Sequence, residues 1–152
     1  MGLWLLLAGS FPLIAQSADG ASRPIYVDDH CQVLGSRSSQ FQADPDVCHF
    51  DGAGMQRSTH LAAKEVDGMR QHTLVNIAEQ TYMLQDIESE PVVFVVAQQV
   101  PEGWHVDSDP QPVQVKNNVA IFRVTAKPGQ IVRLHVGVAH ETPIRDAAAD
   151  EP

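Results

Sequence analysis

Apolar and polar residues alternate along several segments in the second half of the chain. From Val132 to Val138 every second residue is apolar or branched, and Arg133 and His135 lie between these positions. A period of two places apolar side chains on one face of a β-strand and polar side chains on the other. Pro91 to Val96 is a continuous apolar run of strand length. These patterns predict an antiparallel sheet with one solvated face, within residues 70–144.

Turn-forming residues separate the predicted strands. Proline fixes φ, and glycine and asparagine tolerate positive φ, so clusters of these residues favour turns. The segment Lys116-Asn117-Asn118 lies between two predicted strands and predicts a tight hairpin. The segment from Thr73 to Ile87 also fits a weak helical stripe. Because its neighbours are all β, we expect strands there.

The N-terminus has a different pattern, an apolar run from Leu3 to Ala15 that ends in small residues. A short apolar run closed by Ala15-x-Ser17 is typical of a secretory signal peptide, although no Lys or Arg precedes it. We therefore expect residues 1–17 to be a signal peptide, and the protein to be secreted or periplasmic. A membrane anchor and a buried core helix are the alternatives. The run is shorter than the roughly 20 residues that span a bilayer, so we expect no stable membrane insertion.

Residues 18–69 are rich in Asp, Ser, Gln and Gly and contain few apolar runs. We expect this part to be loop-rich, with one or two short strands such as Pro24 to Val27. Because export leads to an oxidising compartment, we expect Cys31 and Cys48 to form a disulfide. Closure of this loop would contribute roughly 3 kcal/mol in the chain-entropy model. At the other end of the chain, residues 145–152 are acidic and small, and they predict a disordered tail.

The chain carries 10 Lys and Arg against 19 Asp and Glu, for a net charge of -9 at pH 7. The basic residues are scattered, and no two are closer in sequence than Arg123 and Lys127. A nucleic-acid surface needs clustered Lys and Arg, so the composition argues against nucleic acid as a partner. Anionic membrane surfaces are disfavoured for the same reason. The negative charge mainly supports solubility.

Candidate metal ligands occur in two mirror-image pairs, His30-Cys31 and Cys48-His49. Two imidazoles and two thiolates could form a tetrahedral zinc site. However, adjacent side chains of an extended chain point in opposite directions, and the predicted disulfide would use both sulfurs. We therefore predict no metal site at these pairs.

The number of histidines is high for this length, but their spacing is not that of a metal site. No two are separated by two or four residues, the spacings that place two ligands on one face of a strand or helix. We therefore predict surface histidines, with a copper or zinc site as the alternative. The histidines are His30, His49, His60, His72, His105, His135 and His140.

Motifs for catalysis are absent from the sequence. It contains no Gly-x-Ser-x-Gly elbow, no phosphate-binding glycine-rich loop and no His-Glu-x-x-His motif. Asp28-Asp29 and Asp44-x-Asp46 are paired carboxylates, but they lack the other ligands of a calcium loop. We expect these carboxylates to be solvated, and we predict no catalytic residue and no cofactor.

Four strings in the second half of the chain carry a family resemblance. They are Tyr82-Met-Leu-Gln-Asp-Ile-Glu-Ser-Glu-Pro-Val-Val-Phe-Val-Val, Val100-Pro-Glu-Gly-Trp104, Ala120-Ile-Phe-Arg-Val-Thr and Lys127-Pro-Gly-Gln-Ile-Val-Arg-Leu-His-Val. Residues 71–141 resemble the closing β-rich region of the mucoidy-inhibitor-A-like proteins, a family of unknown function. Asp86 stands where that family usually has Asn. The resemblance implies an immunoglobulin-like or related β-sandwich and transfers no catalytic residue.

Together, the patterns and the resemblance predict an all-β protein. We expect an antiparallel immunoglobulin-like β-sandwich over residues 70–144, with a loop-rich N-terminal part. We expect its function to be that of a secreted, non-catalytic binding or structural module. Its exposed sheet edges would contact an unknown protein partner. The alternative function is a periplasmic metal-binding protein that uses some of its histidines.

Overall fold

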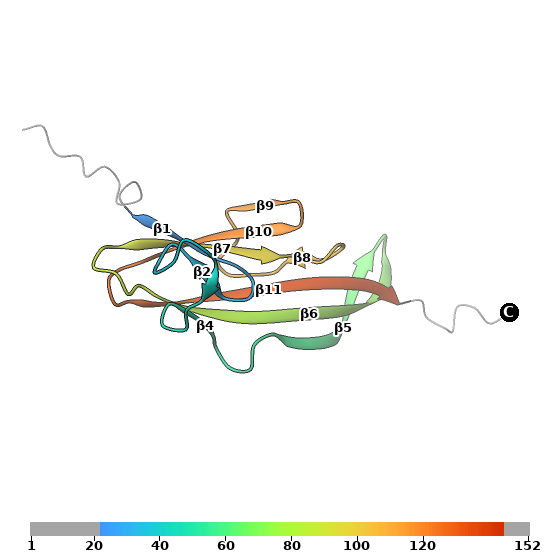
Figure 1. The fold of residues 1–152 in the computed structure, drawn as a ribbon. Coiled ribbons are helices and arrows are strands. Elements are labelled where there is room, and N and C mark those ends of the chain that lie inside the picture. Colours follow the sequence, from blue (N-terminus) through green and yellow to red (C-terminus); the bar gives the residue numbers. More distant parts are fainter. Residues whose placement is uncertain (1–21, 145–152) are drawn as a thin grey trace, which may run out of the picture.

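The computed structural model describes residues 22–144, which form two β-sheets (Figure 1). The predicted signal peptide and the predicted tail lie outside the described residues. The first sheet has the strand order β3 (Gln42–Ala43), β2 (Gln32–Leu34), β1 (Arg23–Val27), β7 (Val92–Gln99), β10 (Val119–Ala126) and β9 (Gln114–Lys116). The second sheet has the order β4 (Cys48–Phe50), β6 (Met69–Gln85), β11 (Ile131–Ile144) and β8 (His105–Val106), and β5 (Gln56–Val66) also pairs with β6. The part of the chain from residue 22 to residue 144 contains no helical segment with the length and hydropathy of a membrane span.

The two sheets enclose one hydrophobic core. The alternation from Val132 to Val138 is confirmed, because Leu134, Val136 and Val138 are buried, while the side chain of His135 is 48% exposed. Aromatic and aliphatic side chains of both sheets fill the core. The largest fully buried ones are Tyr82, Phe94, Phe122, Ile25, Leu84 and Leu134. The all-β prediction is therefore confirmed, and the architecture is a two-sheet sandwich.

Two local predictions are also confirmed. The ambiguous segment that begins at Thr73 is strand, because β6 runs without a break from Met69 to Gln85. Asn117 and Asn118 form a two-residue turn between β9 and β10, with φ of 53° and 62°. Asparagine tolerates this left-handed region better than most residues, so the turn follows from the local sequence.

The N-terminal part contains more strand than predicted. Five strands, β1 to β5, lie before Met69, where the composition predicts one or two. In addition, β1 lies inside the first sheet and pairs in parallel with β7, whereas the strand pairs within residues 70–144 are antiparallel, as predicted. β2, β3 and β4 are short and β5 is almost entirely exposed, so these strands carry little apolar periodicity.

The longest strands of the second sheet form a projecting arm. β11 pairs with β6 along its whole length, and β5 pairs with the first half of β6. We define the arm as β5 together with residues 69–77 of β6 and residues 140–144 of β11. In Figure 1 the tip of the β5–β6 hairpin curls away at one end of the molecule, beyond the strands of the first sheet.

Candidate functional site

The edges of the two sheets differ greatly in length. The first sheet ends in β3 and β9, which have two and three residues, and one edge of the second sheet is β8, which has two. Short edge strands are one way in which natural sheets avoid pairing with other chains. β5 differs, because it has 11 residues and pairs with β6 alone among the strands of residues 22–144. Its second edge is therefore a long row of open backbone donors and acceptors.

The turn and the backbone pairing hold the β5–β6 hairpin together. Asp67 and Gly68 form its two-residue turn, with φ of 54° and 77°. Both residue types accept positive φ, and a turn of this kind matches the twist of the flanking strands. All but one of the β5 residues are exposed, so burial in the core stabilises this strand little. β5 therefore depends on β6 for its strand conformation.

The register of the hairpin decides which backbone groups of β5 face the open edge. Residues of an antiparallel pair alternate between hydrogen-bonded and non-hydrogen-bonded positions, and the pair that closes a two-residue hairpin is hydrogen-bonded. Val66, which closes the hairpin, and every second residue before it therefore bond to β6. The other positions present their N–H and C=O groups to the open edge, and their side chains share one face. These positions are Arg57, Thr59, Leu61, Ala63 and Glu65.

Large apolar side chains are exposed along the same arm. Leu61 is 65% exposed and Met69 is 73% exposed, and Val66 and Ile144 are exposed as well. Leu61 belongs to the positions whose backbone groups face the open edge. An apolar side chain on a long open edge favours pairing with another chain, which native edges normally avoid. The β5 edge thus has the features of an interaction surface.

The predicted disulfide between Cys31 and Cys48 is confirmed. Their Cα atoms are 5.6 Å apart and both residues are buried. Cys31 lies directly before β2 of the first sheet, and Cys48 begins β4 of the second sheet, so the bond joins the two sheets. Because the disulfide uses both thiols, neither sulfur can act as a thiolate ligand. A disulfide also indicates an oxidising location outside the cytoplasm.

The structure distributes the histidines over five strands and the turn after β1. The ring of His140 stacks on Trp104, with ring centroids 5.6 Å apart. Nδ1 of His135 lies 3.0 Å from Oγ1 of Thr81 on the neighbouring strand. Within residues 22–144, no three histidines come close enough to bind one ion. The alternative of a metal site built from several histidines therefore gains no support from their positions.

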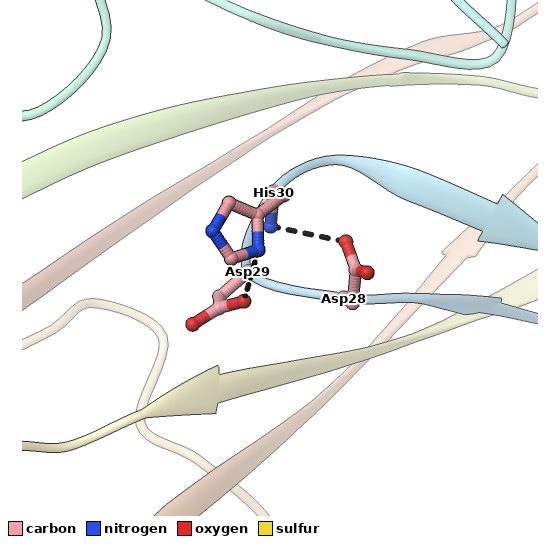
Figure 2. Close-up of side chains that lie close together, drawn as sticks. All are labelled: Asp28, Asp29 and His30. Carbon is pink, nitrogen blue, oxygen red and sulfur yellow. Dashed lines mark hydrogen bonds and ion pairs between the residues drawn. The ribbon is translucent and has the colours of Figure 1, made fainter. Parts of the chain in front are cut away.

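Three other potential ligands, Asp28, Asp29 and His30, lie together in the turn between β1 and β2 (Figure 2), with ligand atoms within 4.8 Å of one another. Oδ1 of Asp28 accepts hydrogen bonds from the backbone N–H groups of His30 and Gln32, at 3.0 and 2.8 Å. Nδ1 of His30 lies 2.9 Å from Oδ1 of Asp29, and the His30 side chain is 81% exposed. These bonds within the turn account for the positions of all three side chains, so the group by itself does not indicate a metal site.

A polar hollow lies on the outer face of the second sheet, beside residues 51–55, which join β4 to β5. Here Oγ1 of Thr81 lies 3.0 Å from Nδ1 of His135, and Nε2 of His135 lies 3.6 Å from Glu79. A hydroxyl, an imidazole and a carboxylate also make up a catalytic triad, but a triad needs a water-excluding site around it. Glu79 and His135 are nearly half exposed, so we interpret the group as a cross-strand cluster. Sequence reasoning missed it because Thr81 and His135 are 54 residues apart.

A buried polar cluster joins the two sheets inside the sandwich. The hydroxyl of Tyr82 donates to Oε1 of Gln98 at 2.5 Å, and Nε2 of Gln80 lies 2.9 Å from the Tyr82 hydroxyl and 2.7 Å from Oε1 of Gln98. Burial of the ring raises the pKa of Tyr82, and the negative charge of Asp29 adds to the rise. Tyr82 therefore stays a neutral donor, and the cluster acts as a structural link between β6 and β7.

The main feature that sequence reasoning missed is β5 itself. Residues 56–66 contain few apolar residues, and their composition predicts loops rather than a long strand. The signal that could have found the strand is the dipeptide Asp67-Gly68, which is typical of a hairpin turn. Even this signal would not have shown that the far edge of β5 is open, because that depends on where distant strands lie.

Comparisons with known proteins identify no relative: no family model, no curated protein and no solved structure matches this chain. The resemblance of residues 71–141 to the mucoidy-inhibitor-A-like proteins therefore stays a prediction. The open edge of β5 is then the observation that bears most directly on function.

Proposed function

We propose that this protein is a secreted or periplasmic, non-catalytic binding module that takes up an extended partner segment along the open edge of β5. One observation carries the proposal: this edge has 11 residues, whereas the edge strands β3, β8 and β9 have two or three. A strand that adds to an open edge gains backbone hydrogen bonds, and its alternate side chains contact those of the edge strand. The exposed Leu61 offers such a contact.

The arrangement of the polar side chains supports a non-catalytic role. Tyr82 is buried and hydrogen-bonded to Gln80 and Gln98, so a substrate that enters from solvent would not reach its hydroxyl. The cluster of Thr81 and His135 lies on an exposed sheet face. Neither group combines a reactive side chain with an enclosed pocket, the combination expected of an active site.

The proposal includes export from the cytoplasm and an immunoglobulin-like classification of the sandwich. The Cys31–Cys48 disulfide joins the two sheets, and an inter-sheet disulfide is also found in antibody domains. Disulfides persist in oxidising compartments, so the same bond supports export.

Peptide selection tests the proposed function. Peptides are selected from a random library on the exported, disulfide-bonded protein, and hydrogen exchange of each complex is compared with that of the protein alone, at protein concentrations too low for self-association. Bound peptides are expected to protect the amides of Thr59, Leu61 and Ala63, which face the open edge. Binding that leaves these amides unprotected would contradict the proposal.

The variant Ala63→Pro tests by mutation whether peptides bind at the open edge of β5. It removes one N–H group from the open edge while leaving the hydrogen bonds to β6 in place, and proline is tolerated at such edge positions. We expect peptide affinity to fall about tenfold, which corresponds to the loss of one hydrogen bond. Ala63→Val keeps the N–H group and should bind as the wild type does. Unchanged affinity in Ala63→Pro would place the binding site elsewhere.

A further inference from the structure

The residues of β5 are arranged symmetrically about the midpoint of the strand. Leu61 is the central residue, and Arg57 and Glu65 lie at equal distances on either side of it. All three belong to the positions whose backbone groups face the open edge, and their side chains share one face. Arg57 and Glu65 therefore place opposite charges at equal distances before and after the exposed Leu61.

This symmetry bears on pairing between two copies of the strand. Two identical strands that meet edge to edge in one antiparallel sheet are related by a two-fold axis perpendicular to the sheet. Because directly opposite residues must share a face, the axis passes through a residue that pairs with itself. The axis at Leu61 is the one that pairs β5 along its full length, with Gln56 opposite Val66 of the second copy.

We propose that two copies of this chain form a homodimer through their β5 edges, paired about a two-fold axis at Leu61. The proposal rests on the open-edge binding proposed above and names a second copy of the chain as the partner. In this register Leu61 packs against Leu61 of the second copy. Arg57 lies opposite Glu65 of the second copy, and the symmetry repeats this pair at the other end of the strand.

The backbone and the charges of β5 both fit this register. Every position with outward N–H and C=O groups lies opposite another such position, so the two edges can exchange hydrogen bonds along the whole strand. Opposite charges directly across two strands stabilise the pairing, whereas like charges oppose it. Glu65 also lies opposite Arg70 of β6 within its own chain, so its carboxylate would lie between two guanidinium groups.

The overall charge of -9 does not prevent contact at this strand. β5 carries two basic residues, Arg57 and Lys64, and one acidic residue, Glu65. Repulsion between distant charges on the two copies is screened at physiological salt, where the Debye length is about 8 Å. The charges on β5 itself therefore determine whether the two copies of the strand attract each other.

Charge-reversal variants of the exported, disulfide-bonded protein test the homodimer. Light scattering during size exclusion, over a series of protein concentrations, measures the mass of the wild type, which should reach twice that of the monomer. Arg57→Glu and Glu65→Arg each place like charges opposite one another at both ends of the strand. Each single variant should raise the dimer dissociation constant at least about tenfold.

Mixing the two single variants gives the sharpest result. The two acidic positions of Arg57→Glu then face the two basic positions of Glu65→Arg, so the equimolar mixture should form a heterodimer, although each variant alone dimerises at least about tenfold more weakly than the wild type. Lys64→Glu is the matched control, because it changes the charge by the same amount on the opposite face, where Ser58 of the second copy would lie. It should dimerise as the wild type does, and circular dichroism should show all variants folded.

The outcomes separate the homodimer from the proposed function. A monomeric wild type, a dimer that Arg57→Glu leaves intact, or a mixture that fails to associate would each overturn the homodimer. If selected peptides still protect the β5 amides in that case, the open-edge function stands with a different partner. A wild-type dimer in which the outward β5 amides exchange freely, and to which peptides bind elsewhere, would overturn both.

Discussion

β7 and β5 differ in how far their side chains are buried. β7 lies between β1 and β10, and most of its residues are buried, including Phe94. β5 pairs with β6 alone, and almost all of its residues are exposed. β7 is a strand because its apolar side chains pack in the core, whereas β5 is a strand because a tight turn pairs it with β6. The described residues outside the arm, which we call the body, therefore maintain the fold, whereas β5 in the arm lies almost entirely in solvent.

The largest loss of stability is expected for a substitution in the core strand β7. Phe94→Ala removes a fully buried ring and should lower the free energy of unfolding by about 3–5 kcal/mol. Leu61→Ala, at a position that is 65% exposed, should change it by less than about 0.5 kcal/mol. Urea denaturation at protein concentrations too low for self-association measures both values. Similar losses in the two variants would show that the arm belongs to the core and would end the distinction.

The disulfide should stabilise the body and leave the arm unaffected. Replacing both Cys31 and Cys48 by Ser opens a loop with a sequence separation of 17 and should lower the free energy of unfolding by about 3 kcal/mol. Hydrogen exchange under native conditions should show little change in the local opening of β5, because the bond joins β4 to the turn before β2. Faster local opening of β5 in this variant would mean that the bridge also supports the arm.

A substitution in the β5–β6 turn should destabilise the arm and leave the body unaffected. Gly68 has a φ of 77° and nothing within 4 Å of the position of an added Cβ, so Gly68→Ala introduces backbone strain without a clash. We expect a cost of about 1 kcal/mol, which would speed amide exchange in β5 about fivefold. Gly54→Ala, at a φ of 96° in the loop before β5, is the control and should leave this exchange unchanged.

Tyr82 provides a pH-dependent test of the body. Its pKa is raised by burial in the folded protein, while the unfolded chain has the ordinary value of 10.0. Below about pH 10 both states keep the proton, so the contribution of Tyr82 is fully present; above it the unfolded state loses the proton first, and stability falls. Tyr82→Phe should remove this alkaline decline and cost about 1 kcal/mol near neutral pH, through the lost hydrogen bonds. A decline that persists in Tyr82→Phe would have to come from other groups.

The strands that could be predicted are those whose burial produces a recognisable pattern of apolar residues. β7 and β11 face the core, so their burial is visible in the sequence as an apolar run and as an alternation. The turn at Asn117 and Asn118 was predictable because its conformation depends on those two residues alone. The disulfide was predictable because the expected compartment and the two cysteines left one pairing. For β5 the sequence contains no such pattern, since its side chains remain in solvent.

Sequence patterns alone establish that this protein is all-β, which residues of β11 face the core, and that Cys31 and Cys48 pair. Local patterns decide these features, because side-chain direction alternates along a strand and two cysteines allow one disulfide. By contrast, the parallel pairing of β1 with β7 and the open edge of β5 become visible only in the folded protein. Both depend on where strands distant in sequence come to lie, and exposed backbone groups leave no pattern in the side chains.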